Sequence, residues 1–138
     1  MKKLIPLLLA ALLLFVSCDA PGVLLLEDQL PPLMEKTTDY TVTESIVVTK
    51  LDTGESVTFS APKEMDTFHQ RLEGVKCTRD KLKESADYYL EYSVDFVTAD
   101  GTSTLFVGET GKHFVLDGYH YEALRGGMDM FYLAGLFN

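Results

Sequence analysis

Hydrophobic and polar residues alternate along much of the chain after Tyr40, which is the pattern of half-buried strands. The clearest case runs over 88–97. One set of alternate residues predicts the side facing the core, and it contains Tyr88, Leu90, Tyr92, Val94 and Phe96. The other set predicts a side that mostly meets water, and it contains Tyr89, Glu91, Ser93, Asp95 and Val97. Similar runs predict strands over 45–51, 55–59, 75–78, 102–107, 113–116 and 119–124.

Two segments have the spacing of helices instead. The first starts near Pro62, with Ser60 as its cap and Gly74 as its stop, and its apolar stripe contains Met65, Phe68, Leu72 and Val75. The second covers 128–137, with Asp129 near its positive end. Two strands, a helix, a strand meander and a helix predict an α+β domain, with an antiparallel sheet and helices on one face.

The first eighteen residues follow a different pattern. Lys2 and Lys3 precede a run over 4–16 that contains no charged residue. Because a helix needs about 20 apolar residues to cross a membrane, this shorter run predicts a signal peptide over 1–17. The run ends at Phe15-Val16-Ser17-Cys18, which resembles a bacterial lipobox, although leucine is more usual where Phe15 stands.

That resemblance implies that Cys18 receives a thioether-linked diacylglycerol and becomes the new N-terminus. The membrane is then a partner through this covalent lipid, and the protein is expected on the extracytoplasmic face of the bacterial cell membrane. The alternative is an ordinary secretory peptide that happens to contain a cysteine.

The residues after the leader divide into a tether over 18–39 and a domain over 40–138. Pro21, Gly22, Pro31 and Pro32 favour a linker, because proline removes backbone donors and restrains the preceding residue. The linker is unusually apolar, however. Residues 23–34 either pack on the domain or lie at the lipid surface, and the pattern leaves both open.

Charge narrows the possible partners. Removing 1–17 removes two of the 12 Lys and Arg residues and none of the 21 acidic ones, so the formal charge changes from −9 to −11. Nucleic acid is therefore not expected as a partner, since it requires a concentrated positive face. The acidity also argues against the domain lying flat on anionic lipid. The one basic cluster, which could meet an acidic partner or form a solvated loop, contains Lys76, Arg79, Lys81 and Lys83.

Cys77 has no disulfide partner in the chain if Cys18 carries lipid. A lone cysteine is either a nucleophile or a small core residue. Val75 and Cys77 alternate with Lys76 and Thr78, which favours the core position.

The lipoprotein start, the turn at Thr53-Gly54, the single long helix and the ending from Leu116 through Leu133 together resemble a family of small uncharacterised lipoproteins of Gram-positive bacteria. The resemblance covers roughly 42–137. It implies no activity, so it assigns no catalytic residue.

Three groups of residues could carry chemistry or binding. A two-residue hairpin at Asp117-Gly118 would pair Val115 with His120 and His113 with Glu122, placing His113, His120 and Glu122 on one face. Two imidazoles and a carboxylate can bind a transition metal, although a solvated sheet face explains the same residues.

Glu91, Ser93 and Asp95 share a strand face, but residues four apart on a strand lie about 13 Å apart, which is too far for a typical pair of catalytic carboxylates. The third group is the tyrosines. Tyr88, Tyr92, Tyr119 and Tyr121 are expected in the core, and Tyr89 is the candidate for partner contact.

No phosphate loop, nucleophile elbow or metal-protease motif is present, and no cofactor is expected. The favoured hypothesis is a non-catalytic binding or interaction module. An envelope protein is one candidate partner for it. The alternative is a small hydrolase or metal-dependent enzyme that uses the His/Glu face.

Overall fold

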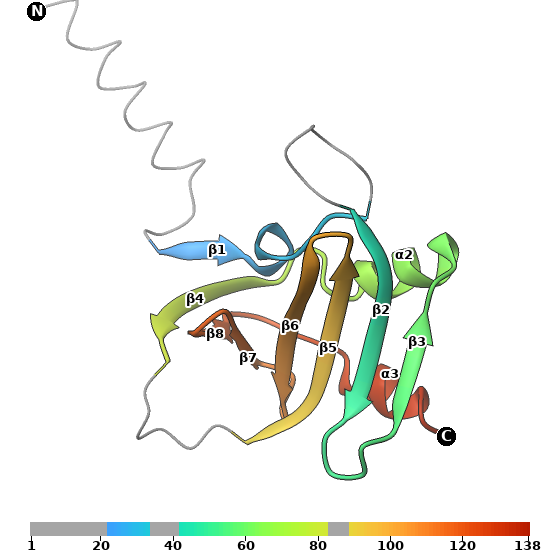
Figure 1. Cartoon of the computed structure of the whole chain (residues 1–138). Helices are drawn as coiled ribbons and strands as arrows, with labels where there is room; N and C mark the ends of the chain where they lie inside the picture. Colours follow the sequence, from blue (N-terminus) through green and yellow to red (C-terminus); the bar gives the residue numbers. More distant parts are fainter. Residues whose placement is uncertain (1–21, 34–41, 83–88) are drawn as a thin grey trace, which may run out of the picture.

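One antiparallel sheet organises the chain, as the alternating pattern predicts. The structure is a computed structural model, and it describes residues 22–33, 42–82 and 89–138. In that part, eight strands lie in the order β1-β4-β8-β7-β6-β5-β2-β3, with two α-helices and one 3-10 helix, which confirms the α+β class. Figure 1 shows β1 and β4 running nearly crosswise to β2, β5 and β6, so the sheet is strongly curved.

The strands are β1 (Val23–Leu25), β2 (Thr43–Lys50), β3 (Ser56–Phe59), β4 (Lys76–Lys81), β5 (Leu90–Thr98), β6 (Gly101–Gly108), β7 (His113–Leu116) and β8 (Tyr119–Ala123). The helices are η1 (Leu26–Gln29), α2 (Pro62–Gln70) and α3 (Met130–Gly135).

The β7–β8 hairpin has the register that its turn predicts. Asp117 and Gly118 both have positive φ, 50° and 80°, as a tight two-residue turn requires. Leu116 then pairs with Tyr119, and the pairing continues to His113 and Glu122. The hairpin therefore places its histidines where the sequence predicts them.

The segment assigned to the tether is partly folded. β1 pairs with β4, with Leu24 opposite Cys77, and η1 follows it directly. Leu26 is fully buried and Leu30 is 7% exposed. The apolar residues that the sequence left open between two surroundings therefore pack on the domain, at least over 23–33.

The long helix begins and ends differently from the prediction. Ala61, rather than Ser60, is the N-cap of α2, and no side chain caps it. Pro62 takes the first helical position, where its missing N–H costs nothing. The helix ends at Gln70, so Leu72 and Val75 follow it in a turn but are still buried.

The short C-terminal helix α3 is two residues later at its start and shorter than predicted. Its position relative to Asp129 is as expected: this side chain is the N-cap and accepts hydrogen bonds from the backbone N–H groups of Phe131 and Tyr132.

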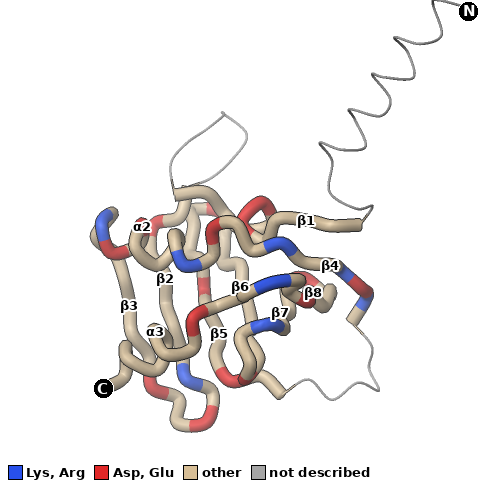
Figure 2. The backbone as a smooth tube through the Cα atoms, turned by 180° about the vertical axis from the view of Figure 1, so that it is seen from behind, with Lys and Arg blue, Asp and Glu red and all other residues tan. Residues whose placement is uncertain are grey.

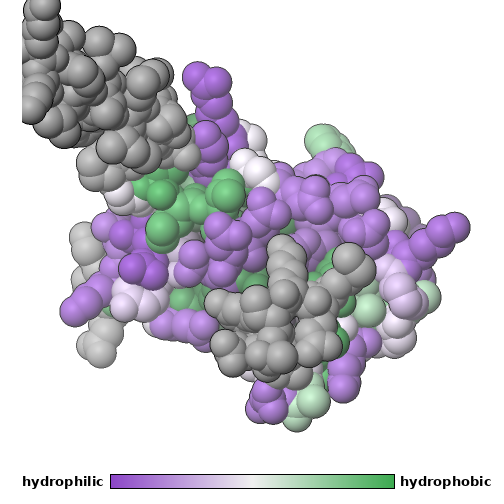
Figure 3. Space-filling model, turned by 90° about the horizontal axis from the view of Figure 1, so that it is seen from above, coloured by the Kyte–Doolittle hydropathy of each residue, from purple (hydrophilic) through white to green (hydrophobic). Residues whose placement is uncertain are grey.

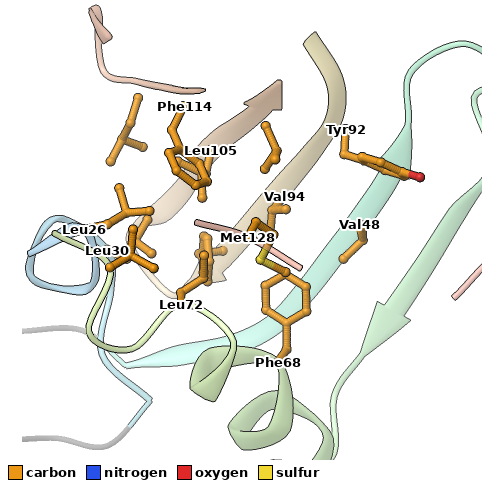
Figure 4. Packing of buried hydrophobic residues seen from close by; sticks show 14 of the residues in the cluster. Leu26, Leu30, Val48, Phe68, Leu72, Tyr92, Val94, Leu105, Phe114 and Met128 are labelled. Atoms are coloured by element: carbon orange, nitrogen blue, oxygen red, sulfur yellow. The ribbon is translucent and has the colours of Figure 1, made fainter. Parts of the chain in front are cut away.

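The core joins the helices to the sheet through aromatic contacts. Phe68 of α2 lies with its ring centre 6.0 Å from Phe59, 6.5 Å from Phe96 and 6.1 Å from Tyr132. Phe137 stacks on Tyr92 at 6.0 Å. Figure 4 shows Phe68 and Leu72 pointing toward the sheet, and Leu26 and Leu30 closing the same core from the N-terminal segment.

Strand β5 confirms one half of its predicted alternation. Tyr92, Val94 and Phe96 are buried, whereas Tyr88 lies outside the described residues. Leu90 was expected on the same side as Tyr92, but a register shift pairs Leu90 with Gly108 and Tyr92 with Val107, which turns Leu90 to the opposite face. Tyr89 precedes the strand and is 66% exposed, whereas Ser93 on the outer side is only 8% exposed. Ser93 was expected to meet water, and it does not because this small side chain lies between its partners Thr49 and Phe106 on the neighbouring strands.

Candidate functional site: a histidine pair on the sheet

His113 of β7 and His120 of β8 bond to each other on the outer face of the sheet; we call them the histidine pair. Nδ1 of His113 lies 3.0 Å from Nε2 of His120. The ring centres are 5.2 Å apart and the rings are 14° from parallel, so the nitrogens, rather than the ring faces, make the closest approach. An N–H···N bond of this kind needs one ring nitrogen to donate and the other to accept.

Strand pairing sets the surroundings of the histidine pair. His120 lies between Asp80 on β4 and Val115 on β7, and Glu122 is opposite His113. Directly paired residues in a sheet point to the same side, so both carboxylates share the face with the imidazoles. The sequence predicts this strand only over 75–78, whereas β4 continues to Lys81, and Asp80 lies in that continuation.

Burial and charge act in opposite directions on His120. Partial burial lowers the pKa of His120 below its ordinary value of 6.5, and the neighbouring His113 lowers it further. Glu122 and Asp80 raise the same pKa, but the net direction is downward. His120 therefore favours its neutral form, which can accept the hydrogen bond from His113.

The three-residue metal centre suggested by the sequence does not form. Within 22–33, 42–82 and 89–138, no three His, Cys, Asp or Glu side chains lie close enough to hold a metal ion. The imidazoles bond to each other, and Glu122 is exposed. The predicted register was right, but a shared face did not bring the carboxylate into a ligand set.

The backbone of Tyr89 and the residue His113 approach the same glycine from two strands. A Cβ built on Gly108 would stand 3.2 Å from the Cβ of His113 and 3.3 Å from the carbonyl oxygen of Tyr89. Both residues therefore flank Gly108, whose missing side chain gives them room. The sequence identified Tyr89 and the histidines separately, and the register shift between Leu90 and Tyr92 means that alternation does not place the Tyr89 side chain on the histidine face.

The two carboxylates of β5, Glu91 and Asp95, are not arranged as a catalytic pair. Asp95 accepts a 2.6 Å hydrogen bond from the hydroxyl of Thr104 on β6. The register between β5 and β6 shifts between Leu90 and Tyr92, next to Glu91. These features describe a cross-strand contact and an irregular strand end, in line with the polar-face interpretation.

Cys77 is a core residue, as the alternation favoured. It is fully buried, and its thiol donates a 3.6 Å hydrogen bond to the carbonyl oxygen of Leu24 on β1. Burial raises the pKa of this thiol, which keeps it from forming the reactive thiolate.

The expected core tyrosines divide into two groups. Tyr92 and Tyr121 are each 2% exposed, whereas Tyr119 is only partly buried and lies under the guanidinium of Arg79 at 4.6 Å. This cation–π contact ties part of the basic cluster to the sheet. Three cations of that cluster lie along β4 rather than in a loop, and Lys83 lies outside the described residues.

Cys18 and the leader also lie outside the described residues, so their predicted roles stay predictions. Among the helices that the structure does describe, none is long and apolar enough to cross a membrane. Comparison with protein-family models, with curated proteins and with solved structures found no match to this chain.

Proposed function

We propose that the protein is an extracytoplasmic lipoprotein of a bacterial cell envelope, in line with its resemblance to small Gram-positive lipoproteins, and that it acts as a non-catalytic binding module. One observation supports the membrane location: an uncharged run too short to span a bilayer ends at Ser17-Cys18. Diacylation at Cys18 would hold the domain firmly, because two lipid chains anchor where one chain holds only marginally.

The proposal includes a binding face. We infer that α2 and α3 cover one face of the sheet, because Phe68 contacts Phe96 and Phe137 stacks on Tyr92, and these two β5 residues point to the same side. The opposite face carries the histidine pair. Tyr89, which directly precedes β5 and is 66% exposed, is the candidate contact residue. Exposed tyrosine is enriched at protein interfaces, since it joins an apolar ring to a polar hydroxyl.

The membrane location is tested by fractionating the producing cells. The full-length protein is expected in the membrane fraction, and Cys18→Ser is expected to abolish lipid attachment and change its processing. Equal membrane retention of both proteins, without lipid on either, would contradict the proposal.

The binding face is tested by crosslinking the protein to its neighbours in its own membrane. Tyr89→Ala is expected to lower recovery of a stoichiometric envelope partner by roughly tenfold or more, the scale of an interface hot spot. Phe131→Ala is the matched control, because Phe131 is another exposed aromatic residue, 91% exposed on α3. Equal recovery with both variants would remove Tyr89 from the interface.

A further inference from the structure

The lipid anchor and the folded domain are separated by very little chain. If Cys18 is the acylated N-terminus, as the proposed function requires, β1 begins only five residues later, at Val23. Five extended residues reach about 17 Å at most. The tether over 18–39 expected from the sequence is therefore far shorter in effect, and the β1 edge of the sheet must stay near the lipid surface.

The strand beside β1 is rich in positive charge. Lys76, Arg79 and Lys81 of β4, which we call the β4 cations, are all exposed, and Asp80 is the one acidic residue on that strand. Figure 2 shows this basic stretch next to β1. Over the rest of the described chain, acidic residues outnumber Lys and Arg.

Apolar surface lies at the same end of the molecule. β1 consists of Val23, Leu24 and Leu25, all half-buried, and Leu82 directly after β4 is 40% exposed. Seen from above, hydrophobic atoms gather at the end where β1 lies (Figures 1 and 3). Apolar side chains beside cations suit the boundary between lipid headgroups and water.

We propose that the β1–β4 edge rests on the anionic headgroups of the membrane that holds the lipid of Cys18. This inference depends on the proposed lipidation. Each Lys or Arg near an anionic leaflet strengthens attachment by roughly fivefold, and the attraction fades over about 8–10 Å. The tether, which is at most about 17 Å long, lets the β4 cations come within that range, while the acidic remainder of the domain is repelled. The domain stands on this edge and holds the far end of the sheet away from the lipid.

The test uses the lipidated full-length protein, purified from the producing membrane and placed in vesicles of phosphatidylcholine and phosphatidylglycerol. A fluorophore is attached at Thr78→Cys on β4 or at Thr53→Cys in the β2–β3 turn, and a lipid with a headgroup nitroxide quenches it. The buried Cys77 does not compete for the label. We expect quenching at position 78 to be at least about threefold stronger than at position 53, and this difference to shrink in vesicles without anionic lipid.

Reversing the charges of the β4 cations gives a second, independent test. K76E/R79E/K81E is expected to remove most of the difference between the two labels, whereas K50E/K63E/K112E, which changes as many charges elsewhere, is expected to preserve it. Thermal unfolding checks that both variants are folded, and the vesicle comparison on the unreversed protein stands even if one is not.

The outcomes separate this inference from the proposed function. Equal quenching at the two labels, with mass spectrometry showing lipid on Cys18, overturns the docking edge and leaves the lipoprotein proposal standing. An unlipidated Cys18 overturns both.

Discussion

The two edges of the sheet are built in opposite ways. At the β3 edge, Phe59 at the end of the strand is held by the helices: it packs against Phe68 of α2, which in turn contacts Tyr132 of α3. The β1 edge has only three residues and is followed directly by the short η1; it pairs with β4, and Leu26 and Leu30 are buried beneath it. The difference teaches that the N-terminal segment over 23–33 is a structural part of the domain, rather than a spacer.

Removing the buried side chain of Leu26 beneath β1 should have the largest effect on stability. Leu26→Ala is expected to lower the free energy of unfolding by about 2–5 kcal/mol, because it leaves a cavity at a fully buried site. Leu51→Ala in the β2–β3 turn, where Leu51 is 41% exposed, should stay within about 0.5 kcal/mol. Urea unfolding of both variants measures this; similar small losses would mean that 23–33 is a spacer after all.

The thiol of Cys77 reports how often the β1 edge opens. In the native protein it should react with a thiol reagent at least about 100-fold more slowly than an exposed cysteine, because the reaction requires β1 to leave β4. Leu26→Ala should accelerate the reaction. The absorbance of the released reagent measures the rate. Fast labelling of the folded wild-type protein would show that this edge is open in solution.

How much of this arrangement could be predicted from sequence depends on how local each signal is. The β7–β8 register follows from Asp117-Gly118 alone, because a two-residue turn fixes which residues face each other, so His113 and His120 were placed correctly. The pairing of Leu24 with Cys77 joins residues 53 positions apart and has no local signal. Proline in 21–32 argued for a linker, and burial of Leu26 and Leu30 overrode it.

The candidate site shows the same limit. Alternation put Tyr89 on the outer side of β5, but the register shift between Leu90 and Tyr92 breaks that alternation, and the hydrophobic pattern does not signal such a shift. Asp80 was missed because polar residues continue β4 beyond the apolar signal at Val75 and Cys77. The prediction that Glu122 joins the histidines in a metal site was wrong for a different reason: residues on one face of a sheet need not converge on one point.

On the helix-covered side, the cap of α3 should matter moderately. Asp129→Ala removes two hydrogen bonds to backbone N–H groups and the exposed 3.5 Å ion pair with Arg71, and it is expected to cost about 0.5–2 kcal/mol. Asp129→Asn keeps the cap without the charge and should recover most of that loss. Thermal unfolding distinguishes them; equal losses for both variants would assign the effect to the ion pair instead.

The smallest effect is expected at the histidine pair. Because the pKa of His120 is lower in the folded protein, the unfolded chain binds more protons below the ordinary value of 6.5. The free energy of unfolding should therefore fall as pH drops from neutral through 6.5 toward the folded pKa. Denaturant unfolding of wild type and His120→Gln between about pH 5 and pH 8 checks the sign, and the variant should depend less on pH. A wild-type protein that gains stability on acidification through this range would contradict it.

The central claim, that the chain is acylated at Cys18 and so brings its β1 edge to the membrane, is tested most directly by the mass of the processed protein. Intact mass and tandem mass spectrometry of protein from the producing membrane are expected to show a chain that starts at Cys18 and carries diacylglycerol on its sulfur. A free thiol at Cys18, or a chain that still contains residues 1–17, would contradict the account.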